Sequence, residues 1–102
     1  MSGRYTEQGK ELNHALQRHK NEAVLAWLNA YIGETRETQT ELAHRAGLSV
    51  NAVSRYAIQR GALGIASLMR LALATGASLD EMVDMDGLRE RLGLGKGDKT
   101  SE

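Results

Sequence analysis

The sequence predicts an all-α fold, and three observations support this prediction. Apolar residues recur three or four positions apart, as at Val24, Leu28 and Ile32, and alternation with a period of two never persists. The chain contains no Pro, and its Gly residues fall between the apolar segments, where helices end. We therefore predict helices over 8–20 and 21–33, or one continuous helix in their place, and over 39–46, 50–58, 66–75 and 79–92.

Polar residues indicate where these helices begin. Thr38 with Glu41, and Ser78 with Glu81, have the spacing of a capping box, in which each side chain binds a free backbone N–H at the start of the helix. Ser49 is a third candidate N-cap. The glycines expected to end helices are Gly33, Gly47, Gly61 or Gly64, Gly76 and Gly87.

Length and composition indicate one globular domain in a reducing compartment. The 102 residues suit a single domain, and 41% hydrophobic with 25% charged residues is an ordinary composition. The chain has no Cys, which excludes disulfides and thiolate metal sites. No apolar run approaches the roughly 18 residues that a membrane span requires, and the first residues do not resemble a signal peptide. We expect a cytoplasmic protein with no membrane partner.

The charges are balanced overall but unevenly distributed. Thirteen basic and thirteen acidic residues give a formal net charge of zero, so whole-chain basicity gives no support for nucleic-acid binding. Residues 1–79 carry a net charge of +3, and residues 80–102 carry −3. A slightly basic body with an acidic C-terminal segment is compatible with a protein that binds specific DNA sites without coating DNA indiscriminately.

Residues 38–58 combine two short predicted helices with a turn at Gly47. Gly47 supplies the positive φ that a sharp turn between helices requires, a conformation that costs other residues about 1–2 kcal/mol. Ala43 is small enough for the two helices to approach closely. Residues expected on the inner faces are Leu42, Ala46, Leu48, Val53 and Tyr56. Residues expected to point outward from the second helix are Ser49, Asn51, Ser54 and Arg55. A short helix with a polar face, held on a compact core, can enter the major groove of DNA.

These residues resemble the Cro/CI-type helix-turn-helix family, the class of the phage repressors. Ala43, Gly47 and Val53 stand four and six residues apart, as that motif requires, and residues 68–82 are similar to the family's fourth and fifth helices without a gap. The resemblance covers residues 21–84. Many members carry Glu-x-Gly after the second motif helix, where this chain has residues 57–59, and Pro where it has Leu63. Both departures concern the path of the 57–65 loop.

The resemblance implies a role in DNA binding for seven residues. Val50, Asn51 and Arg55 would reach base edges, since Val can touch a thymine methyl, Asn favours adenine and Arg favours guanine. Gln39 would face a phosphate at the positive end of the first motif helix. The other phosphate contacts would be Ser49, Ser54 and Arg60. The alternative is that these polar residues form only a solvated helix face.

No other group of residues predicts catalysis or ligand binding. His14 and His19 are five positions apart, on different faces of a helix, and no acidic or Cys partner completes a metal site. Residues 93–100 superficially resemble a phosphate-binding loop, but Asp98 replaces the Gly before Lys99, and no strand precedes the segment. We expect the tail from Gly93 to be disordered. The protein is therefore predicted to be no enzyme, and to use no cofactor, no metal and no small-molecule effector.

Two apolar stripes lie outside a minimal five-helix module. One contains Leu12, Ala15 and Leu16, and the other contains Met82, Val83, Met85, Leu88, Leu92 and Leu94. They either complete the chain's own core or form the interface of a homodimer, which is the usual route to high affinity because one module buries only about 600–1,000 Å² on DNA. Met85, Leu88 and Leu92 are the preferred interface, followed by the helix of Leu12 and Leu16. We predict a helical extension over 1–20, a DNA-binding domain over 21–84, and a C-terminal helix and tail over 85–102 as a candidate dimerisation segment.

The sequence therefore predicts a transcriptional regulator, specifically a dimeric repressor that binds an inverted repeat in double-stranded DNA. The main alternative is an antitoxin, which would use the same motif to regulate its own gene and would also neutralise a toxin. A terminal segment that folds only on a second protein would favour this alternative. A third possibility is an interaction adaptor with no DNA role, and Asn51 and Arg55 argue against it.

Overall fold

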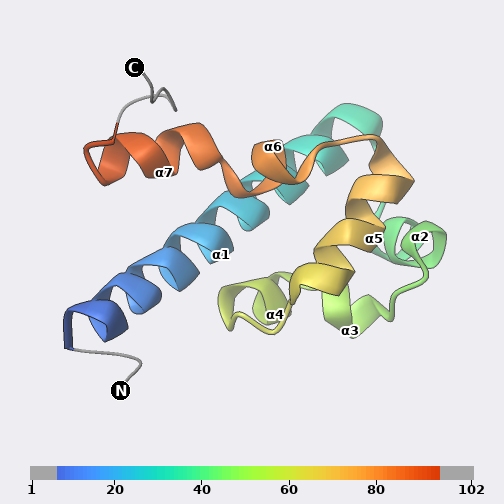
Figure 1. The fold of residues 1–102 in the computed structure, drawn as a ribbon. Coiled ribbons are helices and arrows are strands. Elements are labelled where there is room, and N and C mark those ends of the chain that lie inside the picture. The colour runs from blue at the N-terminus through green and yellow to red at the C-terminus, as the bar shows by residue number, and fades with distance from the viewer. Residues whose placement is uncertain (1–6, 95–102) are drawn as a thin grey trace.

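The computed structural model describes residues 7–94, with the backbone alone at residues 7, 8 and 56. Its helices are α1 (Glu7–Thr35), α2 (Gln39–Ala46), α3 (Val50–Val53), α4 (Arg55–Gln59), α5 (Ile65–Thr75), α6 (Leu79–Val83) and α7 (Met85–Arg91) (Figure 1). Between residues 7 and 94 there is no strand, so the predicted all-α fold is confirmed. The predicted inward position of the Tyr56 side chain lies outside the described part. The predicted disorder of the tail from Gly93 is wrong for Gly93 and Leu94, whose N–H groups bond to the carbonyls of Glu90 and Arg89, and its remainder, residues 95–102, lies outside the described part. None of the described helices is long and apolar enough to cross a membrane.

Helix α1 is one continuous helix, which decides between the two predictions for residues 8–33. At about 1.5 Å of rise per residue, its 29 residues span most of the 43 Å length of the molecule. The prediction that it ends at Gly33 is wrong by two residues. The hydroxyl of Thr35 donates to the carbonyl of Tyr31, and Arg36 then adopts a left-handed conformation with φ of 65° that ends the helix.

The predicted helix starts are confirmed by hydrogen bonds. Thr38 and Glu41 form both bonds of a capping box, at 3.1 and 2.9 Å. Ser49 Oγ accepts a bond from Ala52 N, and Ser78 Oγ accepts one from Glu81 N, which is one of the two bonds of the capping box predicted there. These side chains satisfy backbone N–H groups that have no partner within their helices.

Two predicted helices are each broken in the structure. The helix predicted over 50–58 is interrupted at Ser54, whose ψ of 154° is extended and whose hydroxyl accepts from Ala57 N, so that Ser54 begins α4. The helix predicted over 79–92 is interrupted at Asp84, which has a φ of 52° and accepts from Gly87 N. His19 stabilises this second break because its Nε2 lies 3.0 Å from the carbonyl oxygens of both Val83 and Asp84. His19 is only 8% exposed and was not expected to have a structural role.

The hydrophobic core draws residues from every helix from α1 to α6, with α1 packed on α4 and α6, and α2 packed on α3 and α5. Its fully buried members are Val24, Leu28, Leu42, Ala43, Val53, Ile58, Leu63, Leu68, Leu71 and Met82. Helix α1 contacts both α4 and α6, so it runs between the predicted DNA-binding segment and the C-terminal helices. Helix α7 contains no buried residue, and the core is therefore complete without it.

A polar cluster joins α1, α2 and α5 at the surface of this core. The guanidinium of Arg45 donates to both carboxylate oxygens of Glu37, at 2.7 and 2.8 Å, to the hydroxyl of Tyr31 and to the carbonyl of Ala74. The hydroxyl of Tyr31 in turn donates to Glu37. The hydrogen bonds from Arg45, followed by the one from Tyr31, hold the pKa of Glu37 below its usual value, although partial burial opposes this shift.

The cluster predicts an acid-sensitive contribution to stability. A carboxylate whose pKa is lower in the folded than in the unfolded protein stabilises the fold at neutral pH, and this contribution disappears as the pH falls through the folded-state pKa. Glu37→Gln should therefore lower the melting temperature at pH 7. The difference in melting temperature between this variant and the unmodified protein should become smaller below about pH 4.5. Thermal melts between pH 3 and 7 test this. Glu34→Gln, at an exposed carboxylate on α1, is the control and should give a small difference that does not follow this pH dependence.

Candidate nucleic-acid interface

The turn between α2 and α3 has the geometry that the sequence predicts. Gly47 ends α2 with a φ of 73°, and its N–H bonds to the carbonyl of His44 at 3.2 Å. Leu48 N then bonds to the carbonyl of Ala43 at 2.9 Å, and the Leu48 side chain packs against the core. A Cβ on Gly47 would also lie 2.8 Å from Nη1 of Arg70 on α5. The backbone conformation is what favours glycine here, because the exposed Arg70 side chain can move aside whereas the positive φ is strained for any other residue.

Ala43 is expected where the two motif helices approach one another, and its side chain is fully buried in the core. Ala43→Leu should force α2 and α3 apart and lower the free energy of unfolding by about 1–3 kcal/mol through overpacking. For a domain of this size that loss corresponds to a fall of several degrees in melting temperature. Ala30→Leu, at an exposed position on α1, adds the same atoms to the surface and should leave the melt nearly unchanged. Equal melts for both variants would contradict the close approach at Ala43.

Helix α3 presents its first residues to solvent above a buried anchor. Ser49 caps the helix, Val50 is 43% exposed and Asn51 is exposed, whereas Val53 is fully buried against the core. The Ser49 and Asn51 side chains and the apolar surface of Val50 thus lie together at the amino end of α3. This arrangement provides hydrogen-bonding groups and one methyl-bearing side chain on a rigidly anchored turn of helix.

The break at Ser54 separates Arg55 from this group. Ser54 is half-buried, its hydroxyl donates to the carbonyl of Asn51 at 3.1 Å, and Arg55 becomes the first residue of α4. The prediction of one regular recognition helix over 50–58 is therefore wrong. The exposed guanidinium of Arg55 bonds to Oδ1 of Asn29 on α1 at 3.5 Å, a length at which a hydrogen bond is weak. Arg55 can therefore exchange this partner for another acceptor at little cost.

The two remaining predicted residues flank this segment. Gln39 is the first residue of α2 and is half-buried, and Arg60 is exposed in the turn that follows α4. Two further polar residues border the motif: Asn29 bonds to Arg55, and Arg70 lies beside Gly47. Neither is among the residues that the sequence predicts for DNA binding. Both occupy polar positions of helices whose neighbouring residues are buried, and residue spacing alone does not distinguish them from an ordinary solvated face.

Within residues 7–94 no group of three or more His, Asp or Glu side chains is arranged to hold a metal ion. His19, which the sequence pairs with His14, instead bonds to main-chain carbonyls through Nε2, and its Nδ1 lies 3.1 Å from Nη1 of Arg91. These contacts tie α1 to the break between α6 and α7.

The comparisons with known proteins agree with this geometry. The family model described as Helix-turn-helix, of the Xre/Cro-CI type, matches residues 32–82, from the end of α1 to α6. Neither the curated proteins nor the solved structures yielded a match. The match covers half of the sequence and includes the turn at Gly47 with both helices that it joins. The chain therefore belongs to the Xre/Cro-CI-type helix-turn-helix family of DNA-binding transcription regulators.

Proposed function

We propose that this regulator is a sequence-specific repressor that reads the major groove of double-stranded DNA with α3 and α4. The observation that carries the proposal is the placement of Val50 and Asn51 at the exposed amino end of α3, above the fully buried Val53. A recognition helix contacts base edges mainly through its first residues, and a rigid anchor keeps those residues in register. The break at Ser54 then sets Arg55 on a separate turn of helix, with a different direction of approach.

The seven residues divide into two groups by their chemistry. Val50, Asn51 and Arg55 contact bases and determine the preferred sequence, because their side chains match a thymine methyl, adenine and guanine. Gln39, at the start of α2, and Arg60, after the end of α4, contact phosphates and fix the position of the module on the duplex. Ser49 and Ser54 also belong to the phosphate group. The Ser49 hydroxyl only accepts from Ala52 N, so its hydrogen can be donated to a phosphate oxygen. The Ser54 hydroxyl already donates to the carbonyl of Asn51 and would have to exchange that bond for one to a phosphate.

Selection from a random duplex pool tests this proposal. We expect one sequence motif to be enriched at moderate salt, with an affinity that falls steeply as salt rises because phosphate contacts release counterions. The enriched motif should be an inverted repeat with half-sites about one helical turn apart, as two-fold symmetric modules require. If no motif is enriched, the chain is not a sequence-specific repressor.

We further propose that the protein acts as a homodimer through an apolar surface shared by α1 and α7. One groove of about 240 Å³ has an apolar lining that combines Leu16 from the first predicted stripe with Val83, Met85 and Leu88 from the second. Leu12 at one side and Leu92 at the other remain exposed, at 46% and 42%. Because α7 buries no residue in the protein's own core, its apolar side chains are available to a second copy.

The antitoxin alternative is favoured by a separate surface that the sequence did not indicate. Ile65, Met69 and Leu73 stand four residues apart on α5, and all three are exposed, with Leu73 at 87%. Three large apolar side chains in one row on a regulator of this size form a surface suited to a protein partner. If a second protein binds this row, the regulator would combine DNA binding with the sequestration of that partner.

A further inference from the structure

The amino-terminal half of α1 changes character along one face. Lys10, His14, Gln17 and Asn21 follow one another at helical spacing, and we call them the polar strip. Farther along the same helix this spacing continues into Val24 and Leu28, which are fully buried in the core. The same face of α1 therefore packs against the core at Val24 and Leu28, and carries hydrogen-bond donors where the helix extends past the core toward its amino terminus.

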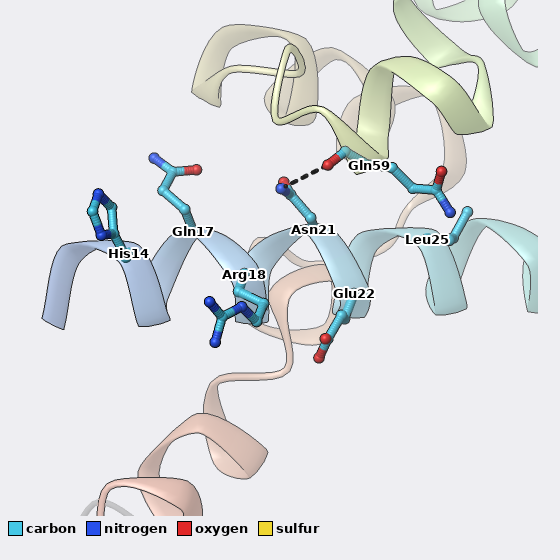
Figure 2. A pocket seen from close by; sticks show the side chains of 7 residues that line it. All are labelled: His14, Gln17, Arg18, Asn21, Glu22, Leu25 and Gln59. Carbon is cyan, nitrogen blue, oxygen red and sulfur yellow. Dashed lines mark hydrogen bonds between the residues drawn. The ribbon is translucent and has the colours of Figure 1, made fainter. Parts of the chain in front are cut away.

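The polar strip lies beside the end of the DNA-reading segment. Figure 2 shows His14, Gln17 and Asn21 projecting from the side of α1 on which Gln59 and α4 lie, whereas Arg18 and Glu22 project from the other side. These residues line an open groove of about 470 Å³. Asn21 Nδ2 donates to the carbonyl of Gln59 at 3.3 Å, and Lys20 Nζ donates to the carbonyl of Leu63 at 3.0 Å. The strip therefore has a fixed position relative to α4.

The depth of the strip matches the shape of a DNA duplex. Packed helices have axes about 8–10 Å apart, so the face of α1 lies about one helix layer behind α4. The major groove is about 8.5 Å deep. When α3 and α4 reach the groove floor, a surface one layer behind them lies at the level of the phosphates that border the groove. From Asn21 to Lys10 the strip extends about 16 Å along the helix axis, which is the length of about five base-pair steps.

The chemistry of the strip fits the same target. Phosphate oxygens accept hydrogen bonds, and Lys, His, Gln and Asn side chains all donate them. Glu22, the carboxylate that lines the same groove, turns to the other side of α1 and pairs with Arg91 at 3.5 Å. We infer that the polar strip of α1 binds the DNA backbone next to the sequence read by α3 and α4, an inference that rests on the proposed function.

Tethered cleavage of the DNA tests the position of the strip. The chain has no Cys, so Gln17→Cys introduces a single thiol that can carry an iron–EDTA group. Bound to the selected duplex, this protein should cut the backbone at a few adjacent positions bordering the half-site. Ala26→Cys, at an exposed position on the opposite face of α1, is the matched control and should not cut there. Equal cleavage patterns from the two positions would overturn the inference.

A gain of affinity provides a second test that unfolding cannot imitate. Gln17 also borders the groove between α1 and α7, so sedimentation must first show that its variants keep the oligomeric state of the unmodified protein. Gln17→Lys should raise affinity for the selected duplex severalfold and steepen the salt dependence by about 0.9 in log–log slope for each bound subunit, as one added phosphate contact per subunit does. Ala26→Lys carries the same charge and should leave the slope unchanged. Equal effects of both variants would indicate attraction by net charge alone and overturn the inference. If the unmodified protein selects a duplex while both position-17 variants behave as their controls do, only this inference fails. If it selects none, the proposed function fails with it.

Discussion

Leu88→Glu should yield a folded monomer whose affinity for the inverted repeat is about 10²–10⁴-fold weaker, the range that joining two binding modules typically contributes. Leu88 lines the groove between α1 and α7 beside Leu16 and Met85, so a carboxylate there would have to be desolvated in a dimer. The fold itself should survive, because α7 contributes no residue to the buried core. Sedimentation velocity at micromolar concentration, with circular dichroism to monitor helicity, measures both expectations.

A matched substitution identifies the interface if it lies elsewhere. Leu73→Glu places the same charge on the apolar row of α5, and under our proposal it should leave the dimer and its DNA affinity intact. If the Leu73→Glu variant is a monomer and the Leu88→Glu variant is still a dimer, the interface lies on α5 instead. A dimer in both variants would make the helix of Leu12 and Leu16 the candidate. A monomeric unmodified protein would contradict the dimer proposal altogether.

Arg55→Ala should weaken binding to the selected duplex by about 1–3 kcal/mol for each half-site, or roughly 5- to 150-fold, and relax the preference at one base-pair position of that half-site. The physical reason is that a guanidinium bound to two acceptors of guanine has no equal partner on another base. In the free protein Arg55 has one long bond, to Asn29, so little is lost when it turns to the DNA. Repeating the duplex selection with the variant measures the loss of preference directly.

Gln39→Ala provides the contrasting result. A phosphate contact carries no sequence information, so this variant should weaken specific and random duplexes to a similar extent and leave the selected motif unchanged. Arg89→Ala, which removes an arginine from α7, should change neither the affinity for these duplexes nor the selected motif. If Arg55→Ala weakens specific and random DNA equally, Arg55 is not a base-reading residue.

The local sequence determined the elements of the helix-turn-helix motif. The capping box of Thr38 and Glu41, the cap at Ser49 and the positive φ of Gly47 depend on residues within a few positions of one another, and all were predictable. The burial of Leu42 and Val53 followed from helical spacing in the same way. The caps and the turn could be read from the sequence because their free energies come from contacts within one or two turns of helix, and the buried faces could be read because apolar spacing repeats within a single helix.

Only the tertiary structure decided where the later helices break and which surfaces meet. No Gly or Pro marks Ser54 or Asp84, and the break at Asp84 is stabilised by His19, which is 65 residues away in the sequence. The contact of Arg55 with Asn29 and the groove shared by Leu16 and Leu88 likewise join residues from separate helices. Such contacts depend on how α1 packs against the domain. A pattern of apolar spacing specifies which face of a helix is buried, but it does not specify the partner against which that face packs.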